Sequence, residues 1–215
     1  MKKTYKNNII SIIIVLFMIL ELGCKKQNDF LNAKPEGALT TIATISDVQK
    51  LLNDEEVFND SGSPGLGEAS TDDYYLTSTT WTSNFEAIEQ NAYIWAKEIY
   101  PAGVGYNDWD LPYKQVYNAN IVLDALPNII TQQSEANVAK GEALFYRSFA
   151  FYNLVQQFAL PYNSKTANTD LGIPLRLNSN LNVKSIRATE QQCYNQILED
   201  LQTAISLLPV SSQYD

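Results

Sequence analysis

The 215-residue chain contains no histidine. Imidazole is the usual base of serine and cysteine hydrolases and a frequent metal ligand, so its absence excludes Ser-His-Asp catalysis, Cys-His catalysis and histidine-ligated metal sites. Basic residues are also few, with 15 Lys and Arg against 24 Asp and Glu and a formal net charge of −9. Because nucleic-acid binding needs clustered positive charge, the composition argues against a nucleic-acid partner. An enzyme of this composition would have to use carboxylate or lysine chemistry.

A long hydrophobic run is also missing. The most apolar stretch, residues 9–20, has about 12 residues, whereas a membrane-spanning helix needs roughly 20. Lysines precede this stretch within residues 2–6, and Gly23-Cys24 follows it. That order is typical of a secretory signal peptide. We therefore expect residues 1–23 to be a signal peptide.

Only two cysteines are present. Gly23-Cys24 resembles the bacterial lipobox, in which the cysteine is acylated and becomes the first residue of the mature chain. Glu21 stands where that motif prefers leucine. We predict lipidation at Cys24, the alternative being an ordinary cysteine in an uncleaved anchor. Lipidation would leave Cys193 without an intrachain disulfide partner, and its place on an apolar helical stripe predicts a packing role.

Helical periodicity dominates the rest of the sequence and predicts a mostly α fold. The predicted helices cover residues 44–58, 109–126, 134–158 and 190–208. We expect caps at Thr44 or Ser46, at Asn107 or Asp108, at Ser134, and at a Thr189–Gln192 capping box. Long irregular loops are expected at residues 59–70 and 161–187.

The predicted helices form antiparallel pairs that resemble tetratricopeptide (TPR) repeats. The last helix has no following partner, and stacked helix pairs bury their apolar faces only against the next unit. Residues 24–215 are therefore expected to be an apparently truncated helical region. The apolar stripe from Cys193 to Leu208 would then leave several large side chains exposed, which would make the protein only marginally stable.

Three polar residues fall on apolar helical positions. Asn120 is expected to hydrogen-bond the backbone of a neighbouring loop, because a buried amide needs several partners. Glu142 and Arg147 lie in a helix that is apolar on nearly every side. Because unpaired charges are costly there, we expect both to be members of structural ion pairs rather than catalysts.

The segment from Thr71 to Asn84 combines acids, aromatic rings and an amide. Its neighbouring carboxylates could ligate a hard cation, or could form a sugar-binding platform with Tyr75, Trp81 and Asn84, where rings cover the apolar faces of a sugar. An ordinary turn with packed aromatic residues is the third interpretation. A phosphate loop is excluded, because Glu68 stands where the lysine would be needed.

Short motifs occur in a characteristic order along the chain. They are the Cys24 lipobox, Asp29–Pro35, Ser70–Tyr75, Tyr113–Asn120, Gly141–Ala150, Leu171–Leu175, and Arg187–Thr189 leading to Leu207-Leu208-Pro209. Together they resemble the SusD/RagB family of Bacteroidetes outer-membrane lipoproteins. Members of this family are usually more than twice as long, so the resemblance implies an N-terminal half with an incomplete SusD-like fold.

The resemblance implies a surface-exposed, non-catalytic lipoprotein in the outer membrane. Such a protein binds oligosaccharides, or in some members peptides, and delivers them to a SusC-like TonB-dependent transporter. The ligand-binding candidates carried over from the family are Asp73, Tyr75, Trp81 and Asn84, and no catalytic residue, metal or cofactor is implied. The alternatives are a carboxylate-dependent glycoside hydrolase and a helical scaffold protein without a small ligand.

Overall fold

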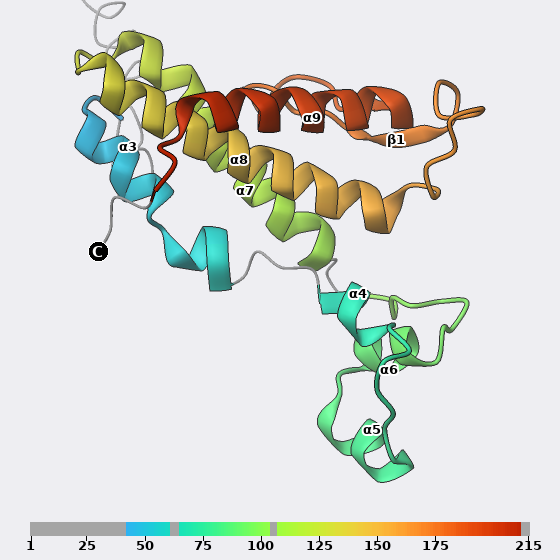
Figure 1. Cartoon of the computed structure of the whole chain (residues 1–215). Coiled ribbons are helices and arrows are strands. Elements are labelled where there is room, and N and C mark those ends of the chain that lie inside the picture. The colour runs from blue at the N-terminus through green and yellow to red at the C-terminus, as the bar shows by residue number, and fades with distance from the viewer. Residues whose placement is uncertain (1–41, 61–64, 104–106, 212–215) are drawn as a thin grey trace, which may run out of the picture. The chain divides into compact units, whose positions relative to one another are not determined.

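The computed structural model describes residues 42–60, 65–103 and 107–211, so the predicted signal peptide and Cys24 lie outside the described residues. Its helices are α3 (Ile45–Leu52), α4 (Gly65–Ala69), α5 (Ser78–Asn84), α6 (Ala87–Tyr93), α7 (Asn107–Ala125), α8 (Gln133–Phe158) and α9 (Glu190–Leu207), with short helical turns η1 (Glu56–Asp60) and η2 (Leu126–Asn128). The strands β1 (Leu171–Pro174) and β2 (Arg187–Thr189) pair antiparallel. The predicted mostly α fold is confirmed (Figure 1). No helix in the described part of the chain combines the length and apolarity needed to cross a membrane.

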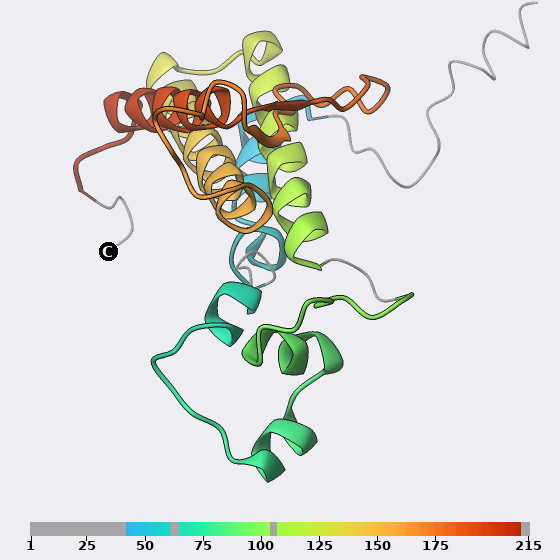
Figure 2. The same ribbon diagram turned by 90° about the vertical axis from the view of Figure 1, so that its right-hand side faces the viewer.

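Three long helices, α7, α8 and α9, form the centre of the fold (Figures 1 and 2). Early α7 lies beside late α8, since Val116 clusters with Phe151 and Leu154, whereas Ala119 packs near Ala139. The α8–α9 contacts also run in opposite order: Arg147 pairs with Asp200, and Gln156 binds Tyr194. Consecutive helices are therefore antiparallel, as a TPR-like arrangement requires.

Helix α3 begins where the sequence predicts and ends earlier. Thr44 and Asp47 form a capping box at its N-terminus, which fits the predicted cap. The helix stops at Leu52, and the predicted continuation to Phe58 is wrong. Asp54 accepts a hydrogen bond from the Val57 backbone N–H (3.2 Å) and so starts a separate turn. A polar side chain that binds the local backbone competes with helix continuation.

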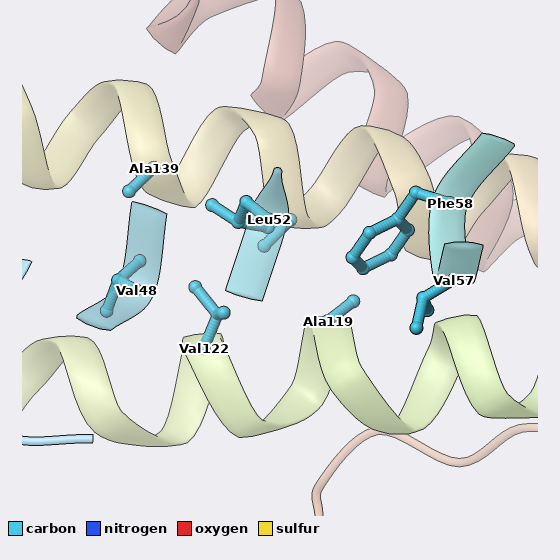
Figure 3. Packing of buried hydrophobic residues seen from close by; sticks show 8 residues of the cluster. Val48, Leu52, Val57, Phe58, Ala119, Val122 and Ala139 are labelled. Atoms are coloured by element: carbon cyan, nitrogen blue, oxygen red, sulfur yellow. The ribbon is translucent and has the colours of Figure 1, made fainter. Parts of the chain in front are cut away.

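Helix α3 and turn η1 nevertheless fill one core. Val48, Leu52 and Phe58 lie between α7 and α8, as Figure 3 shows. The Gln115 Nε2 atom donates to the Val57 carbonyl (3.0 Å) and thereby ties η1 to α7. The Phe58 ring stacks on Tyr146 with centroids 4.1 Å apart.

The second core joins α8, α9 and β1. Cys193 is a free, fully buried thiol, as predicted for a packing residue, and burial raises its pKa. A Cβ atom added at Gly172 would lie 2.5 Å from the Cys193 sulfur, and one at Gly141 would lie 2.8 Å from the Leu208 Cγ atom. Gly172 therefore allows β1 to approach α9 closely, and Gly141 allows α8 to approach the C-terminal end of α9.

Three further local predictions need correction. Helix α8 begins at Gln133 after Gln132, without a side-chain cap, so Ser134 is not the cap. The loop predicted for residues 161–187 contains β1 and the first residue of β2, and these strands are too short for an alternating pattern to reveal them. The loop predicted for 59–70 contains α4.

Contacts of Asp108 are one reason why α4 forms within the segment that was predicted to be a loop. Its carboxylate accepts hydrogen bonds from the backbone N–H groups of Gly65 (3.4 Å) and Leu66 (2.9 Å), at the start of α4. It also accepts one from Gln157 of α8 (2.9 Å). Asn107 or Asp108 was expected to cap the helix that follows, but both lie inside α7, and Asp108 binds the start of a helix some forty residues earlier.

The apolar stripe of α9 is largely covered. Cys193, Ile197 and Ala204 are buried, and the helix packs on α8 and β1. Leu198 and Ile205 remain exposed. Several large side chains of this stripe were expected to be exposed, and Leu198 and Ile205 meet that expectation, whereas the rest of the stripe is at least partly covered.

Candidate functional site

The chain between α4 and α5 carries two of the predicted ligand-binding residues. The Tyr74 hydroxyl donates to the Ala69 carbonyl (2.9 Å), and its ring contacts that of Tyr93, with centroids 5.6 Å apart. The Leu76 backbone N–H donates to the Tyr93 hydroxyl (2.9 Å). Held on both sides, Tyr75 projects outward with 86 % of its surface exposed.

Asp73 lies in the turn before this anchored stretch. Its exposed carboxylate accepts a hydrogen bond from the Thr71 hydroxyl. Within the described residues, no group of three or more Asp, Glu, Cys or His side chains is placed to hold a metal ion. The geometry described so far makes Asp73 an accessible hydrogen-bond acceptor beside Tyr75.

Trp81 and Asn84 lie on α5, which Thr77 caps through the backbone N–H of Thr80. The Trp81 indole N–H donates to the Gln90 carbonyl of α6 (3.1 Å), so this ring joins α5 to α6. Its polar atom is therefore used within the protein, and the side chain is half-buried. Asn84 is the last residue of α5 and is exposed.

A second tryptophan, Trp95, which the sequence interpretation missed, lies just beyond the end of α6. Trp95 has a left-handed backbone with φ 52°. Its backbone N–H bonds the Ala92 carbonyl, and the Ala96 N–H bonds the Asn91 carbonyl. This is the Schellman ending, in which glycine is usual at the left-handed position.

The Trp95 side chain is largely exposed to solvent although it is large and apolar. Trp95 is 73 % exposed, and its indole N–H donates to the Ser70 carbonyl (2.9 Å). A non-glycine residue in this conformation costs about 1 kcal/mol or more, and such strain concentrates at functional sites. The signal in the sequence was Trp95 itself, a large aromatic residue in a stretch for which no helix was predicted.

Trp95 is thus bound through its indole N–H to residues 70–76, the short stretch that also carries Tyr75. Trp81 and Asn84 belong to the next helix along the chain. In the described structure, no hydrogen bond or ring contact joins two of the four predicted residues to each other. We call residues 70–95, with their exposed rings, the aromatic segment.

The buried polar residues form a separate network between helices. Arg147 donates from Nε and Nη2 to the two carboxylate oxygens of Asp200 (2.8 and 2.7 Å), and from Nη1 to Asn120 (2.9 Å). Asn120 in turn donates to the Arg176 carbonyl (2.8 Å), which confirms the predicted contact with a loop backbone. Arg147 is a structural ion-pair member, as predicted.

Glu142 takes no part in that network. No ion pair involves it in the described residues, so the prediction that it is an ion-pair member is wrong. It is half-buried, and burial raises its pKa. Arg147 finds its partner on α9 instead.

Comparison with known proteins identifies the class. Residues 29–215 match the model of a SusD-like family described as starch-binding and associating with the outer membrane. The chain belongs to this SusD-like family, as the motif order predicts. A comparison with curated proteins finds no match.

Solved structures agree on the fold. A putative sugar-binding protein from Bacteroides vulgatus is 25 % identical with a TM-score of 0.64, and the match covers 80 % of this chain and 38 % of that one. A SusD superfamily protein from Bacteroides thetaiotaomicron is 25 % identical with a TM-score of 0.54, covering 78 % and 38 %. A second Bacteroides vulgatus SusD superfamily protein, 20 % identical with a TM-score of 0.63, covers 80 % and 39 % and supports the fold alone. The chain thus spans about two fifths of the length of these relatives.

Proposed function

We propose that this protein captures oligosaccharides at the outer membrane and passes them to a SusC-like TonB-dependent transporter, without catalysis of its own. Membership of a family described as starch-binding and outer-membrane-associated supports the binding role. The likeness to a solved protein described as a putative sugar-binding protein agrees with it. A peptide ligand is the alternative for the same kind of site.

The aromatic segment is the proposed capture surface. The observation that carries this proposal is the exposure of two large rings, Tyr75 and Trp95, each positioned by hydrogen bonds of the surrounding chain. Exposed rings can stack on the apolar face of a sugar, and polar side chains can take its hydroxyl groups. Asp73 and Asn84 supply such groups, and the half-buried Trp81 adds a further ring.

Affinity electrophoresis in a gel containing starch tests the assignment. The unmodified protein should be retarded, and the double variant Tyr75→Ala with Trp81→Ala should lose most of that retardation while its helical circular dichroism stays unchanged. Tyr152→Ala, at a partly exposed tyrosine of α8, is the matched control and should run like the unmodified protein. Full retardation of the double variant would mean that these residues serve packing only.

The same assay separates binding from hydrolysis. A carboxylate-dependent glycoside hydrolase would release reducing sugar from the polysaccharide. We expect retardation without any release. Reducing ends that accumulate with time and disappear on mutation of an acidic residue would favour the hydrolase.

We also propose that Cys24 carries the lipid that holds the protein at the outer membrane. More than one acyl chain is needed for stable anchoring, which bacterial lipoprotein processing supplies. Cells fed a labelled fatty acid should incorporate label into the protein, and Cys24→Ser should abolish this. Equal labelling of both proteins would exclude Cys24 as the site.

A further inference from the structure

A cavity of about 440 Å³ lies beside α7 and contains no residue of the aromatic segment in its lining. One face of α7 forms one side of it, and the loop after β1 forms the other. Its main lining side chains are Trp109, Asp110, Tyr113, Tyr117, Arg176 and Leu181. We call this cavity the α7 cleft. Its size is in the range of small-ligand sites.

The loop wall of the cleft is held in place at three points along α7. The Tyr113 hydroxyl donates to the Pro174 carbonyl (2.7 Å), and Asn120 donates to the Arg176 carbonyl. The Asp124 carboxylate accepts from the backbone N–H and the hydroxyl of Ser179 (2.8 and 2.7 Å). A wall fixed before binding saves a ligand the cost of ordering the loop.

The wall formed by α7 carries aromatic rings and a carboxylate that can accept hydrogen bonds. The Trp109 and Tyr113 rings contact each other, with centroids 5.0 Å apart. Asp110 is exposed and Tyr117 half-buried at the cleft. Among the described residues, neither the Asp110 carboxylate nor the Tyr117 hydroxyl has a hydrogen-bond or ion-pair partner.

The guanidinium of Arg176 is already occupied. Its Nη1 donates to the Val183 carbonyl and the Ser185 hydroxyl (2.5 and 3.1 Å), and its Nη2 donates to the Asn180 carbonyl (2.5 Å). An anionic ligand would have to displace these contacts and would also meet Asp110 in a chain of net charge −9. The cleft therefore disfavours anions.

From this geometry we propose that the α7 cleft is a second carbohydrate site, specific for a neutral pyranose ring and separate from the aromatic segment. The apolar face of the sugar lies on the ring of Tyr117, and its hydroxyl groups donate to Asp110, while Trp109 lines the same cleft and packs on Phe158. A ring face and an acceptor-only carboxylate match a ligand that has C–H faces and many O–H donors. This inference rests on the carbohydrate-binding function proposed above.

The three tryptophans of the chain allow a test that distinguishes the two proposals. Trp81 and Trp95 report on the aromatic segment and Trp109 on the cleft. Protein labelled with 5-fluorotryptophan is titrated with maltoheptaose, a neutral starch oligosaccharide, and in parallel with an oligogalacturonide of equal length. Fluorine NMR signals are assigned by replacing each tryptophan with phenylalanine.

We expect maltoheptaose to shift the Trp109 signal and the oligogalacturonide to leave it unchanged. Tyr117→Ala should weaken the Trp109 response about tenfold, whereas Tyr117→Phe should stay within about twofold, because the ring is retained. Asp110→Asn should weaken it several-fold, since an amide oxygen still accepts from hydroxyl groups.

Three outcomes would overturn the second site. Shifts of Trp81 or Trp95 with an unmoved Trp109 would leave the aromatic segment as the capture surface and remove the cleft. If the Trp109 signal of Tyr117→Ala responds to maltoheptaose as in the unmodified protein, the proposed stacking on Tyr117 is excluded. If no signal moves, both this site and the proposed carbohydrate function fail.

Discussion

At the scale of single residues, Arg147 and Asp200 form an ion pair whose two side chains are both buried. Both side chains are buried, and the guanidinium binds the carboxylate through two parallel hydrogen bonds. Asn120 and Gln196 take further hydrogen-bonding positions. A buried pair of this kind adds little stability compared with apolar residues, but the loss of one partner is costly because the other charge stays buried.

Asp200→Asn should therefore destabilise the protein by about 3 kcal/mol or more. The variant keeps the size of the side chain and removes its charge, so Arg147 is left without a counter-ion. Chemical denaturation followed by circular dichroism measures the change. Glu199→Gln, one residue earlier on the exposed side of α9, is the control and should change stability by less than about 0.5 kcal/mol. Equal effects of the two variants would contradict this role of the pair.

Removing the charge of Glu142 should stabilise the protein, in contrast to Asp200→Asn, and the size of this gain should depend on pH. Burial raises its pKa above the ordinary value of 4.5, so the folded protein binds the proton more tightly than the unfolded chain does. Its contribution is thus fully favourable below about pH 4.5 and is lost as the pH rises through the raised value. Glu142→Gln should stabilise the protein at neutral pH, by less than about 1 kcal/mol because the side chain is only half-buried.

Thermal melts of the Glu142→Gln variant at about pH 4 and about pH 7 test that sign. The gain in stability should be present at the higher pH and vanish at the lower one. A gain of the same size at both values would mean that burial of the charge is not its cause.

At the scale of elements, close approach of β1 to α9 depends on Gly172. A Cβ atom there would lie 2.5 Å from the Cys193 sulfur and 3.2 Å from the Glu190 Cα atom. The strand would have to move away from the helix, since the backbone at Glu190 cannot rotate out of the way. The packing of the β1–β2 pair on α9 would therefore be disturbed by a single methyl group at position 172.

Gly172→Ala should cost about 1–3 kcal/mol, the usual range for overpacking. Adding Cys193→Ala should restore only part of the loss, because the backbone contact remains. Gly67→Ala is the control: its Cβ would meet only the Gln157 Nε2 atom, at 3.9 Å, and alanine favours the helix. Melting temperatures that fall equally for Gly172→Ala and Gly67→Ala would exclude close packing as the explanation.

At the scale of the whole molecule, several large apolar side chains of α8 and α9 are exposed in the described structure. The exposed side chains are Phe145, Phe149, Tyr152, Leu198 and Ile205. The α8 members recur at helical spacing, and the Phe145 and Phe149 rings stack with centroids 6.3 Å apart. Exposed apolar surfaces of this kind favour association.

The purified 215-residue protein without its lipid should therefore self-associate as its concentration rises. Phe149→Lys combined with Ile205→Lys should reduce association in sedimentation velocity experiments and leave the helical content unchanged. Val183→Lys, at a partly exposed loop position, is the control and should associate like the unmodified protein. A protein that stays monomeric over the whole concentration range would contradict the expectation.

Features that depend on neighbouring residues were predictable from the sequence. The capping box of Thr189 and Gln192 and the helix over residues 109–126 both follow from side chains three or four positions apart, which meet in any helix. The burial of Cys193 follows from its place on an apolar stripe. The order of short motifs was sufficient for the family, because it samples nearly the whole chain.

Features that depend on distant residues were decided only by the tertiary structure. Arg147 pairs with Asp200, 53 residues away, and Asp108 binds the start of α4, 42 residues earlier. The exposure of Trp95 and the α7 cleft likewise depend on which segments meet in space. Sequence spacing predicts which face of a helix is apolar, whereas the partner that covers this face depends on the packing of all helices together.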